Sequence, residues 1–134
     1  MQDDTPLTAR CLCGAIRLAC TPPFRWVLHC HCESCRRATA SPMTTFFNVP
    51  DAQLGVTGTP RLHVSSPGVE RAFCGTCGSP VWYRHDDAPD ETHVYAALLD
   101  DPAAVTPEGH DFIAERIEWM HPLPDPQPTE GADT

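Results

Sequence analysis

Long apolar runs are missing from this sequence of 134 residues. No stretch approaches the roughly 18 apolar residues that a membrane-spanning helix needs. Residues 1–10 carry two aspartates and no apolar run, which argues against a secretory signal or a membrane anchor. We therefore expect a soluble protein of the cytoplasm, a reducing compartment in which cysteines stay free of disulfides.

Basic residues are scarce as well. The sequence has nine lysines and arginines against eighteen aspartates and glutamates, so its formal net charge is −9. A chain with this charge balance repels phosphate backbones on average. We therefore expect no nucleic-acid partner.

Helix-favouring runs of alanine and leucine are absent, whereas proline, at 15 residues, is about twice as frequent as the usual ~5%. The length corresponds to one domain with a modest core. Alternating apolar and polar residues between breakers predict seven strands, at residues 15–20, 25–30, 44–49, 61–64, 69–73, 81–84 and 94–98. The first two resemble the arms of a hairpin. We expect a mostly β domain with little helix.

Three further segments complete the chain. A short helix is expected at residues 33–38, which run without a breaker to Pro42. Residues 111–119 fit neither the helical nor the strand period cleanly, and we favour a strand there. From residue 121 onward, four prolines and almost no apolar residues predict a disordered, proline-rich acidic tail at 122–134. This leaves one domain at 5–121.

Seven of the eight cysteines, all except Cys20, stand in short patterns with one or two residues between them. Residues two apart in a strand are separated by about 6.5 Å, near the upper limit for a disulfide, and their Cβ vectors do not converge. A tetrahedral zinc ion tolerates this spacing where the chain curls. The patterns therefore favour metal binding over disulfides.

Cys74 and Cys77 form a zinc-knuckle pattern, in which the following Gly78 permits a positive φ. Cys11 and Cys13, also followed by a glycine, offer a second pair far away in the sequence. Together the two pairs would make a closed site of four thiolates, which joins the N-terminal strand to the second half of the chain. We expect a structural zinc ion there.

Cys30, Cys32 and Cys35 form a different cluster, because no fourth local cysteine completes the tetrahedron. Catalytic zinc sites keep one position open, whereas structural sites fill all four with protein ligands. Apart from an open position, the spacing allows four candidates for the fourth ligand: Cys20, His29, His31 and Glu33. Both histidines flank Cys30 in an extended segment, so their rings point away from its sulfur. Cys20 has the alternation of a strand in the core.

Arg36 and Arg37 follow this cluster directly. Cations beside thiolates lower the pKa of the thiols and can receive an anionic ligand. Solvated arginines on the surface are the equally simple interpretation. Because the chain has so few cations, both arginines are candidates for the site.

These patterns resemble those of a known family, the glutathione-dependent formaldehyde-activating enzymes, which are grouped with centromere protein V in one zinc domain. The resemblance spans about residues 9–119. It rests on five segments: Cys11-Leu12-Cys13-Gly14, His29 to Arg37, Ser65-Ser66-Pro67-Gly68, Phe73 to Pro80, and Leu98-Leu99-Asp100-Asp101-Pro102.

The resemblance implies a β-tent fold of small layered antiparallel sheets with two zinc ions. The structural zinc would have four ligands: Cys11, Cys13, Cys74 and Cys77. The second zinc, with an exchangeable fourth ligand, would have three: Cys30, Cys32 and Cys35. Ala40 stands where the family commonly has glycine, and we expect this alanine to narrow the pocket.

The resemblance also implies an enzyme, a carbon–sulfur lyase similar to S-(hydroxymethyl)glutathione synthase. Its substrates would be a small thiol such as glutathione and an aldehyde or thioether. Our hypothesis is that the thiol binds the second zinc as a thiolate and adds to, or departs from, an aldehyde carbon. Arg36 or Arg37 would receive a glutathione carboxylate, and His29 or His31 would move the proton.

Two other functions stay open at this point. One is a non-enzymatic zinc module that recruits another protein. The other is a redox sensor, in which oxidation of the three-cysteine cluster releases zinc.

Overall fold

The computed structural model describes residues 5–120, which form two β-sheets. The smaller sheet has three strands in the order β1–β2–β5: Leu7–Arg10, Arg17–Cys20 and Leu54–Thr57. The larger sheet has seven strands in the order β10–β3–β4–β9–β8–β7–β6: Gly109–Asp111, Val27–Cys30, Thr44–Pro50, Glu91–Tyr95, Pro80–His85, Val69–Phe73 and Arg61–Ser66. The prediction of a mostly β protein is confirmed.

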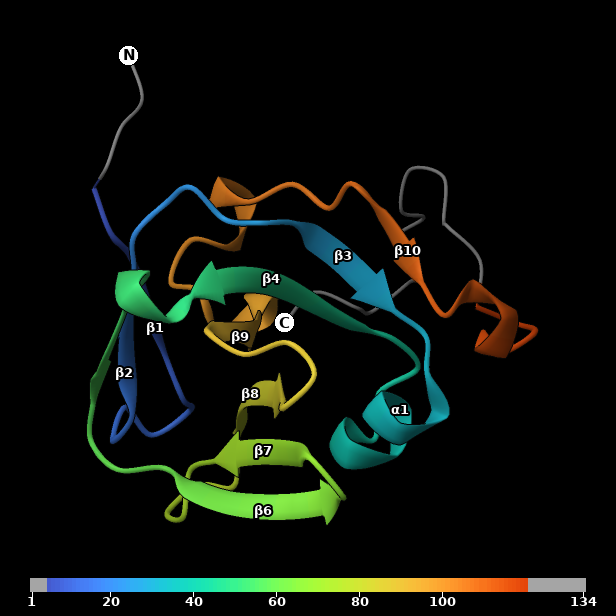
Figure 1. The fold of residues 1–134 in the computed structure, drawn as a ribbon, viewed down its shortest axis with the longest axis horizontal. Helices are drawn as coiled ribbons and strands as arrows, with labels where there is room; N and C mark the ends of the chain where they lie inside the picture. The colour runs from blue at the N-terminus through green and yellow to red at the C-terminus, as the bar shows by residue number, and fades with distance from the viewer. Residues whose placement is uncertain (1–4, 121–134) are drawn as a thin grey trace, which may run out of the picture.

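Helical structure among these residues is limited to short pieces. The α-helix α1 spans Glu33–Thr39. Four 3₁₀ turns lie at Asp51–Gln53, Ala96–Leu98, Pro102–Ala104 and Ile113–Glu115. Figure 1 shows α1 beside the ends of β3 and β4, and the small sheet at the opposite end of the molecule.

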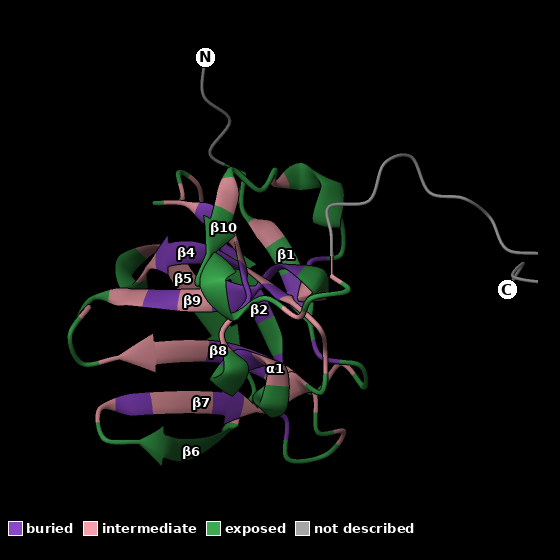
Figure 2. Ribbon diagram, turned by 90° about the vertical axis from the view of Figure 1, so that its right-hand side faces the viewer, coloured by how far each residue is buried: buried purple, intermediate pink, exposed green. Residues whose placement is uncertain are grey.

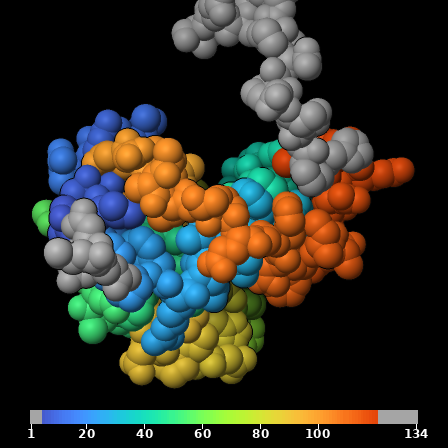
Figure 3. All heavy atoms as spheres, turned by 90° about the horizontal axis from the view of Figure 1, so that it is seen from above, coloured from blue at the N-terminus to red at the C-terminus, as the bar shows by residue number. Residues whose placement is uncertain are grey.

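The strand pairs are antiparallel with one exception, the short strand β10, which runs parallel to β3. Parallel neighbours require a long connection, and here residues 31–108 lie between the two strands. Seen from above in Figure 3, the orange segment that contains β10 lies against the blue segment that contains β3.

The predicted hairpin of residues 15–20 and 25–30 is wrong. β2 pairs with β1 and β5 in the small sheet, whereas β3 pairs with β4 and β10 in the large one. Pro22 and Pro23 stand between them, and proline has no N–H with which to continue a ladder. The chain therefore changes sheets at this point.

Most predicted strands are present within a few residues, as is the helix at 33–38. The strand expected at 94–98 instead begins at Glu91 and ends at Tyr95, where the 3₁₀ turn Ala96–Leu98 follows. The strand favoured at 111–119 is wrong: β10 ends at Asp111, Phe112 takes a left-handed conformation with φ of 54°, and a 3₁₀ turn follows at Ile113–Glu115. β1, β5 and β10 were not predicted.

The two faces of the large sheet differ in character. Phe47 and Val49 of β4 and Val94 of β9 are fully buried in the main core. Leu18 of β2 in the small sheet and Ile16 just before it belong to the same core. Strand alternation turns the residues between them to the opposite face. In Figure 2 the central strand β4 is mostly buried, whereas β6 is exposed along its whole length at the edge of the sheet.

The helix α1 begins and ends on distinct caps. The Cys32 sulfur accepts a hydrogen bond from the Cys35 N–H, so a residue of the three-cysteine cluster is also the N-cap. Ala40 is the C-cap, in the left-handed region with φ of 54°. Ala40 does not itself line the cavity beside the three-cysteine cluster, and its effect on the width of that cavity stays a prediction.

None of the helices within residues 5–120 is long and apolar enough to cross a membrane. The predicted tail at 122–134 lies outside the residues that the structure describes.

The left-handed cap at Ala40 generates a stability prediction. Glycine adopts this conformation without the Cβ penalty, so Ala40→Gly should raise the free energy of unfolding by about 1 kcal/mol. Equilibrium unfolding in urea measures this change in the free energy of unfolding. The matched control is Ala38→Gly inside the same helix, which should lower the free energy by about 0.5–1 kcal/mol. A loss of stability in Ala40→Gly would contradict the assignment.

Candidate metal centres and the adjoining cavity

The first candidate metal centre lies between the small sheet and the turn that joins β7 to β8. Its four sulfur atoms all lie within 4.8 Å of one another, and they belong to Cys11, Cys13, Cys74 and Cys77. The glycine after each pair, Gly14 and Gly78, has a φ of 81°, as the knuckle pattern predicts. Backbone N–H groups donate to the sulfurs, from Ile16 to Cys11 at 3.3 Å and from Thr76 to Cys74 at 3.4 Å.

The sulfur separations in this cluster fit a zinc ion. A tetrahedron with Zn–S bonds of about 2.3 Å has sulfur–sulfur edges of about 3.8 Å. The Cys11 and Cys13 sulfurs lie 3.7 Å apart, and those of Cys13 and Cys74 lie 3.8 Å apart. Thiolates at such distances repel one another unless a cation lies between them. The donor set and its spacing therefore fit the predicted structural zinc.

The second candidate centre stands where β3 ends and α1 begins. The sulfurs of Cys30, Cys32 and Cys35 also lie within 4.8 Å of one another, and no fourth metal-binding side chain joins this group among the described residues. A hydrogen bond with Cys30 and the charge of Arg71 lower the pKa of Cys35 to about 5, although burial of the thiol acts in the opposite direction. The pKa of Cys30 is raised, because its hydrogen bond with Cys35 and its burial disfavour a second thiolate.

Arg71 of β7 is the arginine nearest this cluster. Its two terminal nitrogens each lie 3.9 Å from the Cys35 sulfur. Its Nε donates to the Ser65 hydroxyl at 3.1 Å, and its guanidinium lies over the Tyr83 ring at 5.2 Å. These contacts hold a half-buried positive charge beside the three thiols.

The three-cysteine cluster opens on a cavity of about 1000 Å³. All three cysteines line it, as do four aromatic side chains, one just before β3 and three from β4, β8 and β9: Trp26, Phe46, Tyr83 and Tyr95. Burial raises the pKa of Tyr95 to about 12, against the opposing charge of Arg71. The cavity is large enough for a tripeptide-sized ligand, since small-molecule sites commonly measure about 300–1000 Å³.

A row of side chains crosses the cavity wall from strand to strand. The β-sheet register pairs Asn48 with His93, His93 with Tyr83, Tyr83 with Arg71, and Arg71 with His63. Directly paired residues share one face of a sheet. The register therefore places a histidine, a tyrosine and an arginine side by side on the face that lines the cavity.

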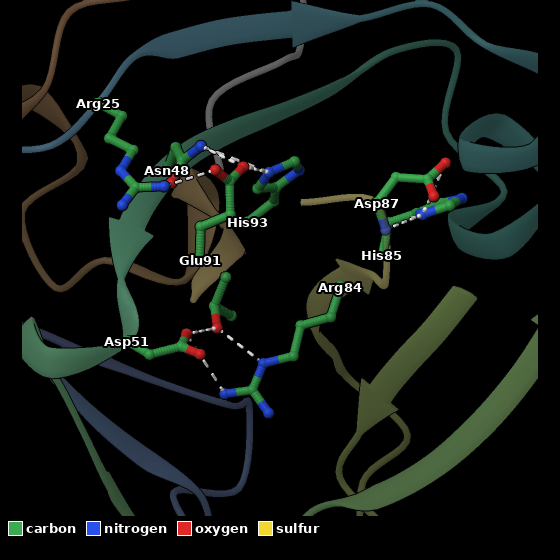
Figure 4. Close-up of polar contacts among 9 residues, drawn as sticks. Arg25, Asn48, Asp51, Arg84, His85, Asp87, Glu91 and His93 are labelled. Carbon is green, nitrogen blue, oxygen red and sulfur yellow. Dashed lines mark hydrogen bonds and ion pairs between the residues drawn. The ribbon is translucent and has the colours of Figure 1, made fainter. Parts of the chain in front are cut away.

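His93 is the most tightly held member of this row. Its Nε2 lies 2.6 Å from Glu91 Oε2, and Glu91 also accepts hydrogen bonds of 2.6 Å from Asn48 and from Arg25. Figure 4 shows Glu91 and Asn48 beside the His93 ring, with Arg25 on the other side of the Glu91 carboxylate. Burial acts to raise the pKa of Glu91, but the hydrogen bonds outweigh it and hold the pKa below its ordinary value. Glu91 is thus a carboxylate at neutral pH.

The two histidines predicted from the sequence lie elsewhere. His29 Nδ1 lies 2.8 Å from the Thr45 hydroxyl, and buried His31 has its Nε2 2.9 Å from His110 Nδ1. Neither histidine lines the cavity. Burial and the neighbouring charge of His110 lower the pKa of both. These contacts fit a role in joining β3 to β10 and β4.

The other predicted residues divide between the cavity and the rest of the molecule. Arg37 lines the cavity but is 77% exposed and lies 3.5 Å from Glu33. Arg36 has a buried Nε without a partner and does not line the cavity. Cys20 is fully buried in the main core and does not belong to the three-cysteine cluster, so it is not the fourth ligand. Burial raises its pKa to about 12.

Sequence reasoning missed Arg71 and His93. Arg71 lies in a correctly predicted strand, but only the pairing with its neighbours decides which face it joins. His93 precedes the strand expected at 94–98, so it fell in a predicted loop. The available signal was the spacing of Glu91 and His93, because polar residues two apart share one face of a strand.

Fold and sites together define a small β protein with two candidate zinc centres, one of which faces a cavity. The chain belongs to the family of glutathione-dependent formaldehyde-activating enzymes, whose model matches residues 6–115. The resemblance noted in the sequence is therefore confirmed.

Two curated relatives and one solved structure are similar to the chain. A Halomonas elongata protein, provisionally named a glutathione-dependent formaldehyde-activating enzyme, is 27% identical over 85% of this chain and 79% of its own length. An uncharacterized lyase of Schizosaccharomyces pombe is 28% identical over 66% of this chain and 65% of its own length. A crystal structure of a Rhodobacter sphaeroides protein shares the fold, with a TM-score of 0.63 and 21% identity, over 78% of this chain and all of the other.

The two clusters predict separable zinc losses. Cys77→Ser should remove one zinc per chain and lower the free energy of unfolding by several kcal/mol, because structural zinc contributes folding free energy. Cys35→Ser should remove the other zinc with a much smaller loss of stability. Metal analysis and thermal unfolding of both variants test this. Equal destabilisation by the two substitutions would contradict the division of roles.

Proposed function

We propose that this protein is a zinc-dependent enzyme that forms or cleaves the adduct between a small thiol, such as glutathione, and an aldehyde. In this role it is a carbon–sulfur lyase of the S-(hydroxymethyl)glutathione synthase type. The observation that carries the proposal is the opening of Cys30, Cys32 and Cys35 on a cavity of about 1000 Å³. Family membership supports it, as do the relatives named as an aldehyde-activating enzyme and as a lyase.

The three cysteines suit one particular kind of metal chemistry. A zinc ion held by them would keep one position for a substrate sulfur and hold it as a nucleophilic thiolate at neutral pH. The half-buried guanidinium of Arg71, 3.9 Å from the Cys35 sulfur, offsets the negative charge that gathers there. A cluster of thiolates without such a neighbour would be less tolerant of one more anionic sulfur.

The cavity provides room and contacts for the rest of a thiol substrate. Arg37 stands at its edge and can receive a carboxylate, in keeping with the role predicted for it. The aromatic wall of Trp26, Phe46, Tyr83 and Tyr95 excludes water from the place where the carbon–sulfur bond would change. A module that only recruits another protein would have no use for a cavity beside its cysteines.

Two wider features belong to the same proposal. The family match over residues 6–115 supports one catalytic domain at 5–121. All eight cysteines are free, which supports a reducing compartment such as the cytoplasm as the place of action.

The proposal is tested with glutathione and formaldehyde as the probe substrates. The wild-type protein should form the hemithioacetal faster than it forms without protein. NMR exchange spectroscopy measures this rate as the exchange between free formaldehyde and formaldehyde bound to glutathione. Cys35→Ser should lose this acceleration, because it removes one of the three thiols at the cavity. The matched control is Cys20→Ala, which removes a buried thiol outside both clusters and should stay active.

Two outcomes would overturn the proposal. One is a wild-type protein, loaded with two zinc ions, that gives no acceleration with glutathione and formaldehyde. The other is full activity in Cys35→Ser.

A further inference from the structure

The pair of Glu91 and His93 takes no part in the binding of the thiol at the three cysteines. Both residues belong to β9, on the face of the strand that also carries Tyr95. His93 lines the same cavity as the three cysteines, and its side chain is only 16% exposed. A nearly buried histidine with a carboxylate partner, facing a cavity, calls for a chemical explanation.

The hydrogen bonds fix which ring nitrogen carries the proton. Glu91 is a carboxylate and accepts only, so the His93 Nε2 at 2.6 Å must donate to it. Asn48 and Arg25 donate to the same carboxylate, and Arg25 offsets its charge. In neutral His93 the lone pair is therefore on Nδ1, for which there is no hydrogen-bond partner among residues 5–120.

Aromatic neighbours fix the plane of the ring as well. Tyr83 stacks on His93 with ring centroids 5.4 Å apart, and Trp26 meets it edge to face at 4.6 Å. A side chain held by packing on two sides and by a carboxylate on its edge keeps one orientation. This is the arrangement that proton transfer requires, because it is sensitive to small errors in position.

The other histidines do not share these features. His29 and His31 lie away from the cavity. His85 lines it, but its Nδ1 accepts a hydrogen bond from the Asp87 N–H at 2.9 Å. His85 Nδ1 also lies 3.6 Å from the Asp87 carboxylate, but that carboxylate is 92% exposed. His63 also lines the cavity, but it is exposed on the edge strand β6 and has no carboxylate partner among the described residues. Among the described residues, only His93 combines cavity lining, a ring packed between two aromatic side chains and a 2.6 Å contact with a largely buried carboxylate.

We propose that His93, oriented by Glu91, is the proton-transfer residue of this cavity; the proposal rests on the function proposed above. His93 Nδ1 takes the proton of the substrate thiol, and the S–H electron pair stays on sulfur. The sulfur then forms a bond to the aldehyde carbon, and the carbonyl π electrons move to the oxygen. His93 returns the same proton to that oxygen, so thiol and aldehyde give a hemithioacetal without any further reactant. Cleavage is the same sequence reversed.

His93→Gln is the direct test. The glutamine amide can still donate a hydrogen bond to Glu91, but it cannot take up a proton from one substrate and pass it to the other. With glutathione and formaldehyde, kcat should fall by about 10²-fold or more, whereas KM should change by less than about threefold. Glu91→Gln, a positioning variant, should lower kcat to a smaller extent. His29→Gln is the matched control, because this histidine has a hydrogen bond of its own to Thr45 but does not line the cavity, and its activity should stay within about threefold of wild type.

Two readouts separate catalysis from a structural role. Added imidazole should restore part of the activity of His93→Ala, because the free base can enter the space of the missing ring. The ¹⁵N NMR signals of the His93 ring should show the proton on Nε2 in the wild type, and Glu91→Gln should alter that tautomer.

Unchanged kcat in His93→Gln would overturn the inference, as would a loss in His93→Ala that imidazole does not restore. The cysteine variants keep this result separate from the proposed function. If Cys35→Ser is inactive while His93→Gln is fully active, only the role of His93 fails. If Cys35→Ser is fully active, the proposed function fails first.

Discussion

The crowding of three thiols at the junction of β3 and α1 is the constraint around which the site is arranged. Three sulfurs within 4.8 Å cannot all become thiolates unless positive charge is brought to them. The fold brings part of that charge with Arg71, from a strand four positions away across the sheet. The same cluster caps α1 through Cys32, so the helix and the candidate centre form together. A divalent cation between the three sulfurs would offset the negative charge that Arg71 leaves uncompensated.

The four-cysteine cluster leaves this junction free for chemistry. It joins the turn after β1 to the turn between β7 and β8, so the small sheet is attached to the large one at a second point besides the core. β1 gains a further attachment through the bridge between Ala9 and Leu99 and the hydrogen bond of Thr8 to Asp100. With the small sheet fixed on one face of the large sheet, the opposite face can form the cavity wall.

Local patterns allowed a large part of this architecture to be predicted. Cysteine spacing identified both clusters, because metal ligands within a knuckle are neighbours in sequence. Alternation identified most strands and α1. The exchange of sheets between β2 and β3 was missed, since a proline pair marks a break but not the partner of the strand that follows. β10 was missed because its three residues pair with β3 from far away in the chain.

The cavity residues were harder to predict for the same reason. Arg36 and Arg37 were candidates because they adjoin the cysteines in sequence, yet the arginine beside the Cys35 sulfur is Arg71, 36 residues further on. His29 and His31 adjoin Cys30 and face His110 or Thr45 instead of the cavity. What brings Arg71, Tyr83 and His93 into one row is the register of three strands, β7, β8 and β9. Register depends on contacts across the whole sheet, and adjacency in sequence does not report it.

The central claim is that the centre of Cys30, Cys32 and Cys35 accepts a substrate sulfur, and X-ray absorption at the zinc edge tests it most directly. Without a thiol, the protein loaded with two zinc ions should show about 3.5 sulfur neighbours per zinc, because seven cysteines are shared between two ions. With glutathione the value should rise to about 4. A value of 4 before glutathione is added, or of 3.5 that glutathione does not change, would contradict the account.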